Sequence, residues 1–510
     1  MINLEKDKPI KLKNMLAYGG GDFFGGGSFA VLGLWLMFFY TTYAGLSPAQ
    51  AGGIIALARL LDAISDPLMG YVTDNFYRTR LGRRFGRRGF FFLFGGPLVM
   101  VTYISMWIDG MGFYYYLSTY ILFYLTYTLV IVPYETLAAE MTNDFKERSK
   151  LTGVRIFFST GAGILAAWLP GRIINVLGEN NPSSFLYMGM VFGVLFAIVI
   201  VLLYIFTWER PIAFDPNAPK KNFTQDMKNL FFSLTSTFRV KTFRQHVGMY
   251  LGAYVALDVL GAILVYYIVF VLGESAVNAS NALTFMTIVQ FFCVALFISL
   301  CLKLGNGISY KIAQIFMLLS VGLFLSIHLF SLPYTSWLVL VAAMLMGIGR
   351  SGTYYVCWNI YSFIPDVDEM LTGKRREGIF AGVMTFVRKA VQALALFLVG
   401  MILQHYGFVA KSATQSPETI SGIVLVFGIG SVTLLAFGII CSMKFKLTRQ
   451  NHAVLVSEIN RLKNNGNKLH VTPEARHATE LLTGWKYEQL WGNNNVSRED
   501  EVFAEHQNVN

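Results

Sequence analysis

Apolar residues occupy most of the chain in long blocks, and short polar stretches separate these blocks. Each block has about 20 residues or more, the length that an α-helix needs to cross the hydrocarbon core of a bilayer. The sequence lacks the ten-residue alternation of an outer-membrane β-barrel. The pattern therefore predicts an all-α integral membrane protein with twelve crossings. These are residues 14–43, 49–73, 88–107, 113–140, 151–176, 184–207, 244–272, 279–303, 309–332, 335–364, 378–404 and 419–445.

The longest polar stretch between crossings, residues 208–243, divides them into two groups of six. Two six-helix halves joined by a central linker are typical of major-facilitator transporters, whose substrate cavity lies between the halves near the bilayer midplane. We expect the polar tail to be mostly a solvated extension, with one amphipathic stretch from His452 to Leu462. The predicted division is an N-terminal segment 1–13, a bundle 14–207, a linker 208–243, a bundle 244–445 and a tail 446–510.

Composition agrees with a membrane protein, because 55% of the 510 residues are hydrophobic and 14% are charged, against about 25% charged in soluble domains. The net charge of +11 does not indicate a nucleic-acid partner, since the basic residues gather in alternate loops. By the positive-inside rule these loops and both termini are cytoplasmic. The basic loops are 74–88, 141–150, 208–243 and 365–377.

The four cysteines fall in apolar segments without paired spacing, which predicts neither a disulfide framework nor a metal site.

Three charges in the second crossing need a reason that lipid contact cannot supply, because each costs roughly 2.5–3.5 kcal/mol at mid-membrane. Arg59, Asp62 and Asp66 are spaced by three and four residues, so they share one helix face. Two carboxylates one turn apart either hold a proton or bind a small cation such as Na⁺ between them, and both outcomes couple the site to an ion gradient. The alternative is a structural ion pair between Arg59 and one aspartate.

The first half carries further charges within its apolar segments. Asp22 lies among the glycines of the first crossing, and we expect it to face the cavity because a lone intramembrane acid indicates a functional site. Glu135 and Arg155 lie in neighbouring crossings, where they can pair across two helices or bind substrate.

The sign of the charges in the second half indicates the kind of substrate. Near mid-span, Asp258 alone is acidic, whereas Arg350, Arg388 and Lys389 are basic. An excess of buried positive charge favours a substrate with an anionic group. In the alternative, Arg350 snorkels or pairs with Asp258, and only Lys389 lines the cavity.

Three motifs resemble those of the glycoside–pentoside–hexuronide:cation symporter family. The first is Arg59-Leu-Leu-Asp62-Ala-Ile-Ser-Asp66-Pro67-Leu-Met-Gly70, the second joins Asp74 to the basic run 78–84, and the third spans 364–380. The resemblance extends over about residues 15–445. It implies that Asp62 and Asp66 bind the cation, that Asp22 and Arg155 contact the sugar, and that Lys389 lies near both sites.

The candidate residues form three groups. The candidate cation-binding residues are Asp62, Asp66 and Thr128, with Na⁺ as a possible metal at the two aspartates. The candidate substrate-binding residues are Asp22, Tyr127, Glu135, Arg155, Arg350, Tyr354, Thr385, Arg388 and Lys389. The candidate coupling or gating residues are Arg59, Asp74, Arg83, Asp258, Asp368 and Arg375.

Together these observations predict a secondary active symporter that couples Na⁺ or H⁺ entry to uptake of an anionic sugar by alternating access. A hexuronate, a hexuronide or an acidic oligosaccharide would fit. We expect a monomer surrounded by lipid in a bacterial inner membrane, without a cofactor. Alternatives are a carrier of a neutral glycoside or pentoside, a transporter-like sugar sensor that signals through residues 446–510, and a lysolipid carrier. A membrane enzyme is disfavoured, because it would need a water-facing catalytic loop with paired acids or a metal motif, whereas the loops here are short and basic.

Overall fold

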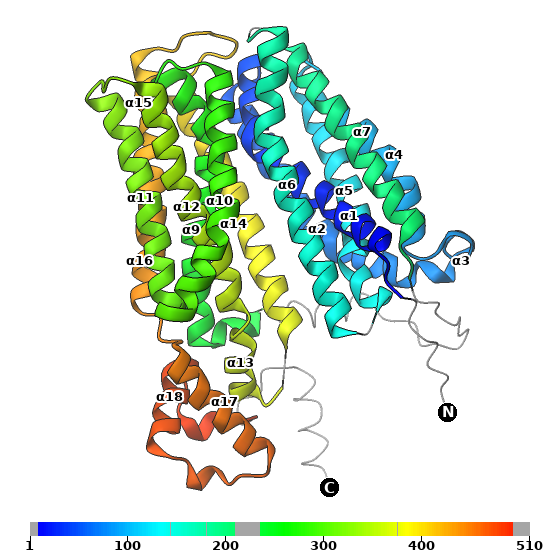
Figure 1. Cartoon of the computed structure of the whole chain (residues 1–510), viewed down its shortest axis with the longest axis vertical. Helices are drawn as coiled ribbons and strands as arrows, with labels where there is room; N and C mark the ends of the chain where they lie inside the picture. Colours follow the sequence, from blue (N-terminus) through cyan, green and yellow to red (C-terminus); the bar gives the residue numbers. More distant parts are fainter. Residues whose placement is uncertain (1–8, 143, 180, 210–234, 375, 493–510) are drawn as a thin grey trace.

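The computed structural model describes residues 9–492, except 143, 180, 210–234 and 375. The side chains at 63, 64, 67, 71, 74, 75, 139, 145, 149, 377, 378 and 381 also lie outside the described part. The chain folds into two helical bundles that stand side by side, with a smaller helical unit below the second bundle (Figure 1).

The first bundle contains the predicted crossings before the linker. A short helix, α3 (Arg80–Phe85), follows the second of them. In the first crossing, α1 continues through two π-helical turns, which are common at functional or bent positions, as far as Tyr43. The crossing helices are α1 (Leu12–Val31), α2 (Pro48–Asn75), α4 (Gly89–Ser105), α5 (Phe113–Met141), α6 (Phe145–Leu177) and α7 (Ser183–Phe206).

The second bundle contains the remaining crossings. A short helix, α13 (Ile364–Thr372), joins the tenth crossing to the eleventh, and a π-helical turn joins α15 to α16 within the last one. The helices are α9 (Lys241–Tyr266), α10 (Ala276–Leu304), α11 (Asn306–Leu329), α12 (Thr335–Tyr361), α14 (Glu377–His405), α15 (Pro417–Leu425) and α16 (Ser431–Met443).

A helix occupies every crossing that the sequence predicts. In the described part of the chain, nine helices are long and apolar enough to span a membrane by themselves. Of the other three crossings, α2 carries charged residues and α4 is short. The all-α membrane fold of two helical halves is therefore confirmed.

The two halves lie closest together at one end of the molecule. We name the end that carries residues 446–492 the tail end and the opposite end the far end. The bundles lie close together toward the far end and stand apart toward the tail end (Figure 1). At the far end the hydroxyls of Thr41 and Tyr266 are 2.6 Å apart, and Ser280 Oγ donates to the carbonyl oxygen of Ala167 at 2.5 Å. These bonds join the first half to the second.

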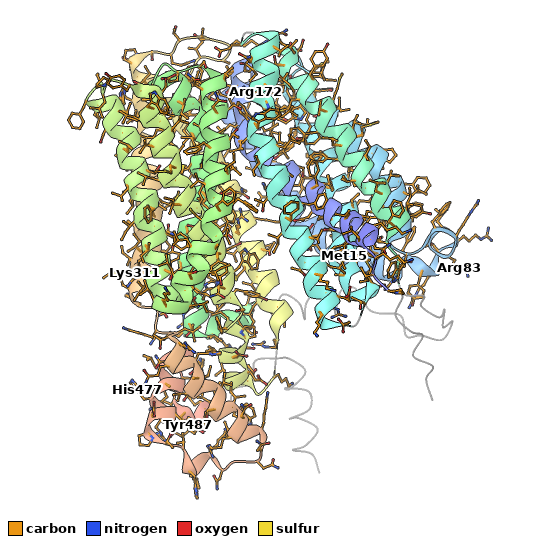
Figure 2. All side chains as sticks on the ribbon, viewed as in Figure 1. Met15, Arg83, Arg172, Lys311, His477 and Tyr487 are labelled. Carbon is orange, nitrogen blue, oxygen red and sulfur yellow. The ribbon has the colours of Figure 1, made fainter. Side chains whose placement is uncertain are left out.

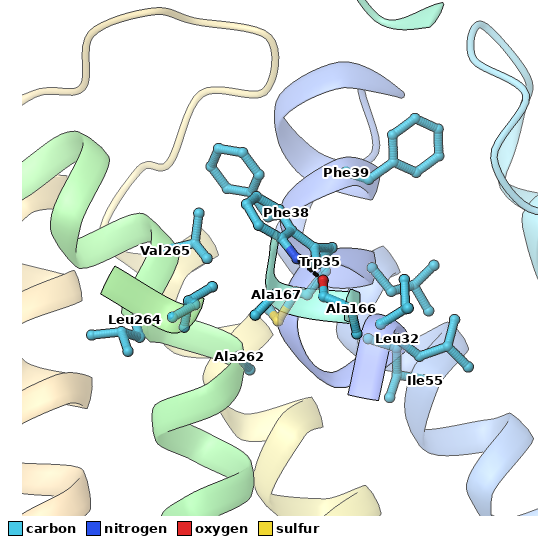
Figure 3. Close-up of a cluster of buried hydrophobic side chains, with 14 of the residues drawn as sticks. Leu32, Trp35, Phe38, Phe39, Ile55, Ala166, Ala167, Ala262, Leu264 and Val265 are labelled. Carbon is cyan, nitrogen blue, oxygen red and sulfur yellow. Dashed lines mark hydrogen bonds between the residues drawn. The ribbon is translucent and has the colours of Figure 1, made fainter. Parts of the chain in front are cut away.

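A buried aromatic cluster strengthens this far-end contact. Trp35 is fully buried, and its indole nitrogen donates to the carbonyl oxygen of Ala166 at 3.1 Å. Phe38 of the first half packs edge-on against Tyr266 of the second, with ring centroids 5.3 Å apart. Figure 3 shows Trp35 and Phe38 together with Leu264 and Val265 of α9. Packing between the halves is thus continuous with the core of the first bundle.

Residues 446–492 of the tail are folded, unlike the mostly solvated extension that the sequence suggested. Residues Arg449–Lys463 form α17, which contains the predicted amphipathic stretch, and Pro473–Thr483 form α18. Leu455, Ile459 and Leu462 are buried in one core with side chains of α13. Because these positions recur at helical spacing, they needed an apolar partner surface. Hydropathy alone could not indicate that α13 supplies it.

Polar contacts fix the tail to the second half. The carboxylate of Glu369 pairs with Lys463 at 2.7 Å, and Asp366 lies 2.8 Å from His452 Nε2. The backbone nitrogen of Trp491 donates to the carbonyl oxygen of Met370 at 2.9 Å. All three partners lie on α13, so the tail braces the segment between α12 and α14.

Glu458 inside the tail gives a prediction for its stability. Arg461 Nη2 donates to this carboxylate at 2.7 Å, and the Tyr487 hydroxyl donates to it as well. Burial alone would raise the pKa of Glu458, but these hydrogen bonds outweigh it and lower the pKa. The carboxylate therefore stabilises the tail above the ordinary glutamate pKa, and this contribution is lost as pH falls through the lowered value. We expect Glu458→Gln to speed limited proteolysis of the tail at neutral pH.

The same experiment carries its own control. The Glu474→Gln variant changes an exposed acid in the first turn of α18, and its digestion rate should match that of the unchanged protein. In strong acid the Glu458→Gln variant and the unchanged protein should converge. Equal digestion of the two at neutral pH would show that Glu458 does not hold the tail together.

Candidate functional site

The middle of the molecule holds an ion-pair cluster that joins the two halves. Ser47 caps α2 and Pro48 begins it, so the helix carries Asp62 and Asp66 into the membrane on one face. Lys389 reaches them from α14: its ammonium lies 2.7 Å from Asp62 Oδ2 and 2.5 Å from Asp66 Oδ2. Asp62 is only 1% exposed. A lysine of the second half thus bridges two carboxylates of the first.

Hydroxyl groups complete this cluster. Thr128 of α5 lies 3.1 Å from Asp62 Oδ1 and 3.2 Å from Asp66 Oδ1, and its single proton can serve only one of them at a time. Ser65 Oγ is 3.4 Å from the Thr128 hydroxyl. The sequence analysis did not single out Ser65, although its position beside Asp66 was a signal. Carboxylate and hydroxyl oxygens are suitable ligands for a small hard cation.

The cluster is not a conventional multidentate metal centre. In the described part of the chain, no group of three or more His, Cys, Asp and Glu side chains is placed to hold a metal ion. The two carboxylates carry two negative charges, and the hydroxyls are neutral. Lys389 balances one of these charges, and one monovalent cation or one proton can balance the other. The arrangement therefore suits a weakly held, exchangeable cation.

Arg59 does not form the ion pair considered as an alternative. Its guanidinium lies over Phe29, 4.4 Å from the ring centroid, and 5.4 Å from that of Tyr124. Within the described residues no carboxylate lies within 4 Å of it. Lys389 takes the place at the aspartates that Arg59 could have filled.

A second charged group lies in the first half. Arg155 of α6 is 3.2 Å from Asp22 Oδ1 and 4.0 Å from Glu135 Oε1. The side chain of Glu135 is 60% exposed. Glycine lets α1 come close to α5, because a Cβ atom on Gly21 would lie 2.3 Å from the ring of Tyr134. Asp22, Arg155 and Glu135 are therefore brought together, as their substrate-binding prediction requires.

Tyr127 occupies a less accessible place than the other candidates of this half. It is 8% exposed, and its ring centroid lies 5.3 Å from that of Phe24 and 4.5 Å from that of Phe29. Its hydroxyl is 3.4 Å from the carbonyl oxygen of Gly25. The ring packs in the core of the first half, and a substrate contact by Tyr127 stays a prediction.

The second half contains two arginines with different partners. Arg388 lies 3.2 Å from Asp258 Oδ1 and stacks over Tyr254, 4.6 Å from the ring centroid. Arg350 instead donates from Nε to the side-chain oxygen of Gln290 at 3.0 Å. The alternative pairing of Arg350 with Asp258 is thus not formed. The sequence analysis missed Gln290, because an uncharged amide in an apolar segment gives little signal.

Two further candidates lie near these arginines. The guanidinium of Arg350 is 5.8 Å from the ring centroid of Tyr354, one turn along α12. Thr385 is exposed on α14, one turn before Lys389. Tyr354 is partly buried and packs against the core of the second half, and the substrate contacts of both residues stay predictions.

Two of the gating candidates, Asp368 and Arg83, lie apart from this group. Asp368 is fully buried and accepts hydrogen bonds from Arg376 at 2.6 and 2.9 Å, whereas the predicted Arg375 lies outside the described residues. The side chain of Asp74 does too. Arg83 is exposed at the outer edge of the first bundle, at the tail end (Figure 2). Arg376, the neighbour of the predicted Arg375, therefore pairs with Asp368.

In the central region the number of acidic side chains equals the number of basic side chains. Asp22, Asp62, Asp66, Glu135 and Asp258 face Arg59, Arg155, Arg350, Arg388 and Lys389. Each of the two halves contributes members of both signs. With every group ionised, the central region is neutral before any solute binds.

Two helical bundles with charged residues between them define a secondary transporter of the major-facilitator type. Residues 17–449 match the family described as MFS/sugar transport protein, so the chain belongs to this family. The inner membrane symporter YicJ of Escherichia coli (strain K12) is 27% identical over 89% of this chain and 96% of its own length. The resemblance to glycoside–pentoside–hexuronide symporters is confirmed: the protein is a multi-pass sugar/cation symporter and not an enzyme.

Two further relatives and one solved structure extend this comparison. A glucuronide carrier protein homolog of Escherichia coli is 24% identical over 90% of this chain and 97% of its own length. A proposed sulfoquinovose importer of Salmonella typhimurium is 26% identical over 91% and 96%. A bacterial homologue of the lysosomal transporter Spinster, in an inward-facing and unoccupied conformation, has a TM-score of 0.61 at 14% identity, covering 86% of this chain and 98% of that one. The likeness to this solved structure shows a shared fold and nothing more.

Proposed function

We propose that this protein takes up an anionic sugar, such as a hexuronate or hexuronide, together with Na⁺ or H⁺ across a bacterial inner membrane. The charge balance of the central region is the observation that carries the proposal. One cation added at Asp62 and Asp66 leaves one excess positive charge in a low-dielectric space, which is costly. A singly charged anionic substrate restores neutrality, so cation and anion favour each other's binding.

The cation acts on the contact between the halves. Lys389 now holds Asp62 and Asp66 from the opposite bundle. A cation bound by the same carboxylates competes with the ammonium of Lys389, and it weakens the link between α2 and α14. Because a ligand shifts a conformational equilibrium by its differential affinity for the two states, this competition couples cation binding to movement of the halves.

The sugar lies between the halves in this proposal. Asp22, Arg155 and the exposed Glu135 offer hydrogen-bonding partners for sugar hydroxyls, and Arg350 offers a charged partner for the acid group. Two relatives are named for acidic sugars, since glucuronides carry a carboxylate and sulfoquinovose a sulfonate. Their names support this substrate class.

We assign the arrangement described here to a state that faces the tail end. The inter-half bonds of Thr41 and Ser280 hold the far end together, and the bundles stand apart at the tail end (Figure 1). With the basic loops on the cytoplasmic side, this is the state that releases solute into the cell. Alternating access then requires these far-end contacts to break in turn.

Uptake into proteoliposomes tests the proposal. We expect a labelled glucuronide to accumulate under an imposed Na⁺ or H⁺ gradient, and a neutral disaccharide not to accumulate. The gradient that supports accumulation identifies the coupling ion. Accumulation of the neutral sugar alone would overturn the anionic substrate.

A neutral glycoside is the second candidate substrate. The observation that favours it is the Arg388–Asp258 pair, which already neutralises one of the basic residues. In that case uptake of the neutral sugar would survive replacement of Arg350, because no acid group would depend on it.

A further inference from the structure

We infer that Gln290 sets the preference of this transporter for acidic over neutral substrates, by orienting Arg350 while leaving its charge uncompensated. The inference rests on the proposed uptake of an anionic sugar and assigns the selectivity to one uncharged side chain. The Gln290 amide is the partner that distinguishes Arg350 from the other cations of the central region.

The contrast with three of those cations is the first step. The fourth, Arg59, also has no carboxylate within 4 Å among the described residues, but it packs against the rings of Phe29 and Tyr124. Lys389 is held by Asp62 and Asp66, Arg388 by Asp258 and Arg155 by Asp22, each at 3.2 Å or less. Arg350 has no carboxylate within 4 Å among the residues that the structure describes, and its side-chain hydrogen bond goes to an amide. An amide accepts the bond without cancelling the charge. Arg350 therefore keeps a full positive charge for a ligand.

The amide also determines which atoms remain available. Gln290 Oε1 accepts the bond from Nε of Arg350 at 3.0 Å, and the ring of Tyr354 lies beside the guanidinium. These contacts fix the plane of the group and leave its two terminal nitrogens for another partner. A planar pair of N–H donors matches the oxygens of a carboxylate or sulfonate in a bidentate contact.

The position of Gln290 makes this contact possible. It lies three residues after Thr287 on α10, so the two side chains share a face. That face points to the first half, because a Cβ atom on Gly163 of α6 would lie 3.8 Å from the Thr287 methyl group. Gln290 is one turn closer to the tail end, where the bundles separate (Figure 1). Both Gln290 and Arg350 are partly exposed, so a solute between the halves can reach them.

The Gln290→Glu variant tests the inference with a nearly isosteric change. A carboxylate 3 Å from Nε would pair with Arg350 and cancel its charge. The measurement is the ratio of apparent affinities for a glucuronide and for the matching neutral glucoside, from competition with labelled substrate in proteoliposomes of the full chain. We expect this ratio to fall about tenfold, which corresponds to one lost charge-assisted contact. The control Gln290→Met keeps the volume without adding charge and should lower the ratio less.

A double variant separates a specific effect from a structural one. If Gln290 acts through Arg350, then changes at Gln290 should alter the ratio in the unchanged background and not in Arg350→Gln. An equal effect in both backgrounds, or equal ratios for Gln290→Glu and Gln290→Met, would overturn the inference. Should the glutamate variant fail to fold, Gln290→Met in the two backgrounds gives the same test.

The proposed function and this inference fail in different ways. Absence of glucuronide binding by the unchanged protein overturns the anionic substrate itself. Glucuronide uptake that depends on Arg350 but ignores Gln290→Glu overturns only the role of Gln290.

Discussion

The Asp66→Asn variant should lose gradient-driven accumulation, with the ratio of internal to external substrate falling to about one. The change removes one of the two carboxylates around Lys389 and keeps the size of the side chain. With a single carboxylate left, the ammonium of Lys389 alone neutralises the cluster, and an added cation gains little. The measurement is uptake of labelled substrate into proteoliposomes with an imposed cation gradient.

Two comparisons make this result specific. Substrate exchange without a gradient should persist in Asp66→Asn, because the Asp22–Arg155 pair and Arg350 are unchanged. The control Asp109→Asn changes an acid in a loop at the far end, outside the crossings, and should accumulate substrate normally. Undiminished accumulation by Asp66→Asn would show that the cation binds elsewhere.

Hydropathy was sufficient to predict the crossings, because a membrane helix must satisfy its backbone internally and present apolar side chains to lipid. It predicted α2 as a crossing despite its charges. The spacing of Asp62 and Asp66 predicted that they share a face. The sequence could not show that Lys389, more than 300 residues later, lies between them, and only the family resemblance pointed to it.

Pairing is the part of the site that composition leaves open. Counting charges in the second half gives an excess of cations. In the structure, however, Lys389 pairs with an aspartate of the first half, and Arg388 pairs with Asp258. The same limit applies to Asp368, whose partner Arg376 the sequence analysis did not single out. Arg376 is the N-cap of α14, with backbone angles outside the helical region, and sequence patterns do not give side-chain directions at such a position.

The contacts between the halves are of two kinds, ionic contacts in the middle and close helix packing at the far end. The Lys389 cluster is ionic and, in the proposed mechanism, responds to cations, whereas the far-end contacts depend on small residues that let helices approach. Gly52 of α2 and Gly400 of α14 meet there: a Cβ atom on Gly52 would lie 2.9 Å from the carbonyl oxygen of Leu396 and 3.4 Å from the Cα of Gly400. Close approach of this kind needs glycine.

The Gly52→Val variant should therefore favour the state in which the far end is open. Backbone atoms cannot move aside for the new side chain, so closing the far end gains a cost of about 1–3 kcal/mol. Such a cost shifts the equilibrium between the two states by about five- to 150-fold. We expect the uptake rate to fall at least about fivefold, while equilibrium binding of substrate persists because the protein remains folded.

Gly53→Val is the matched control for this variant. Gly53 is the next residue of the same helix, and a Cβ atom there meets nothing within 4 Å, so the added side chain should leave uptake close to normal. Both substitutions place the same β-branched residue in α2 and cost the helix the same propensity. A difference between them thus reports the contact with α14. Equal uptake by Gly52→Val and Gly53→Val would mean that the far end need not close through this glycine contact during transport.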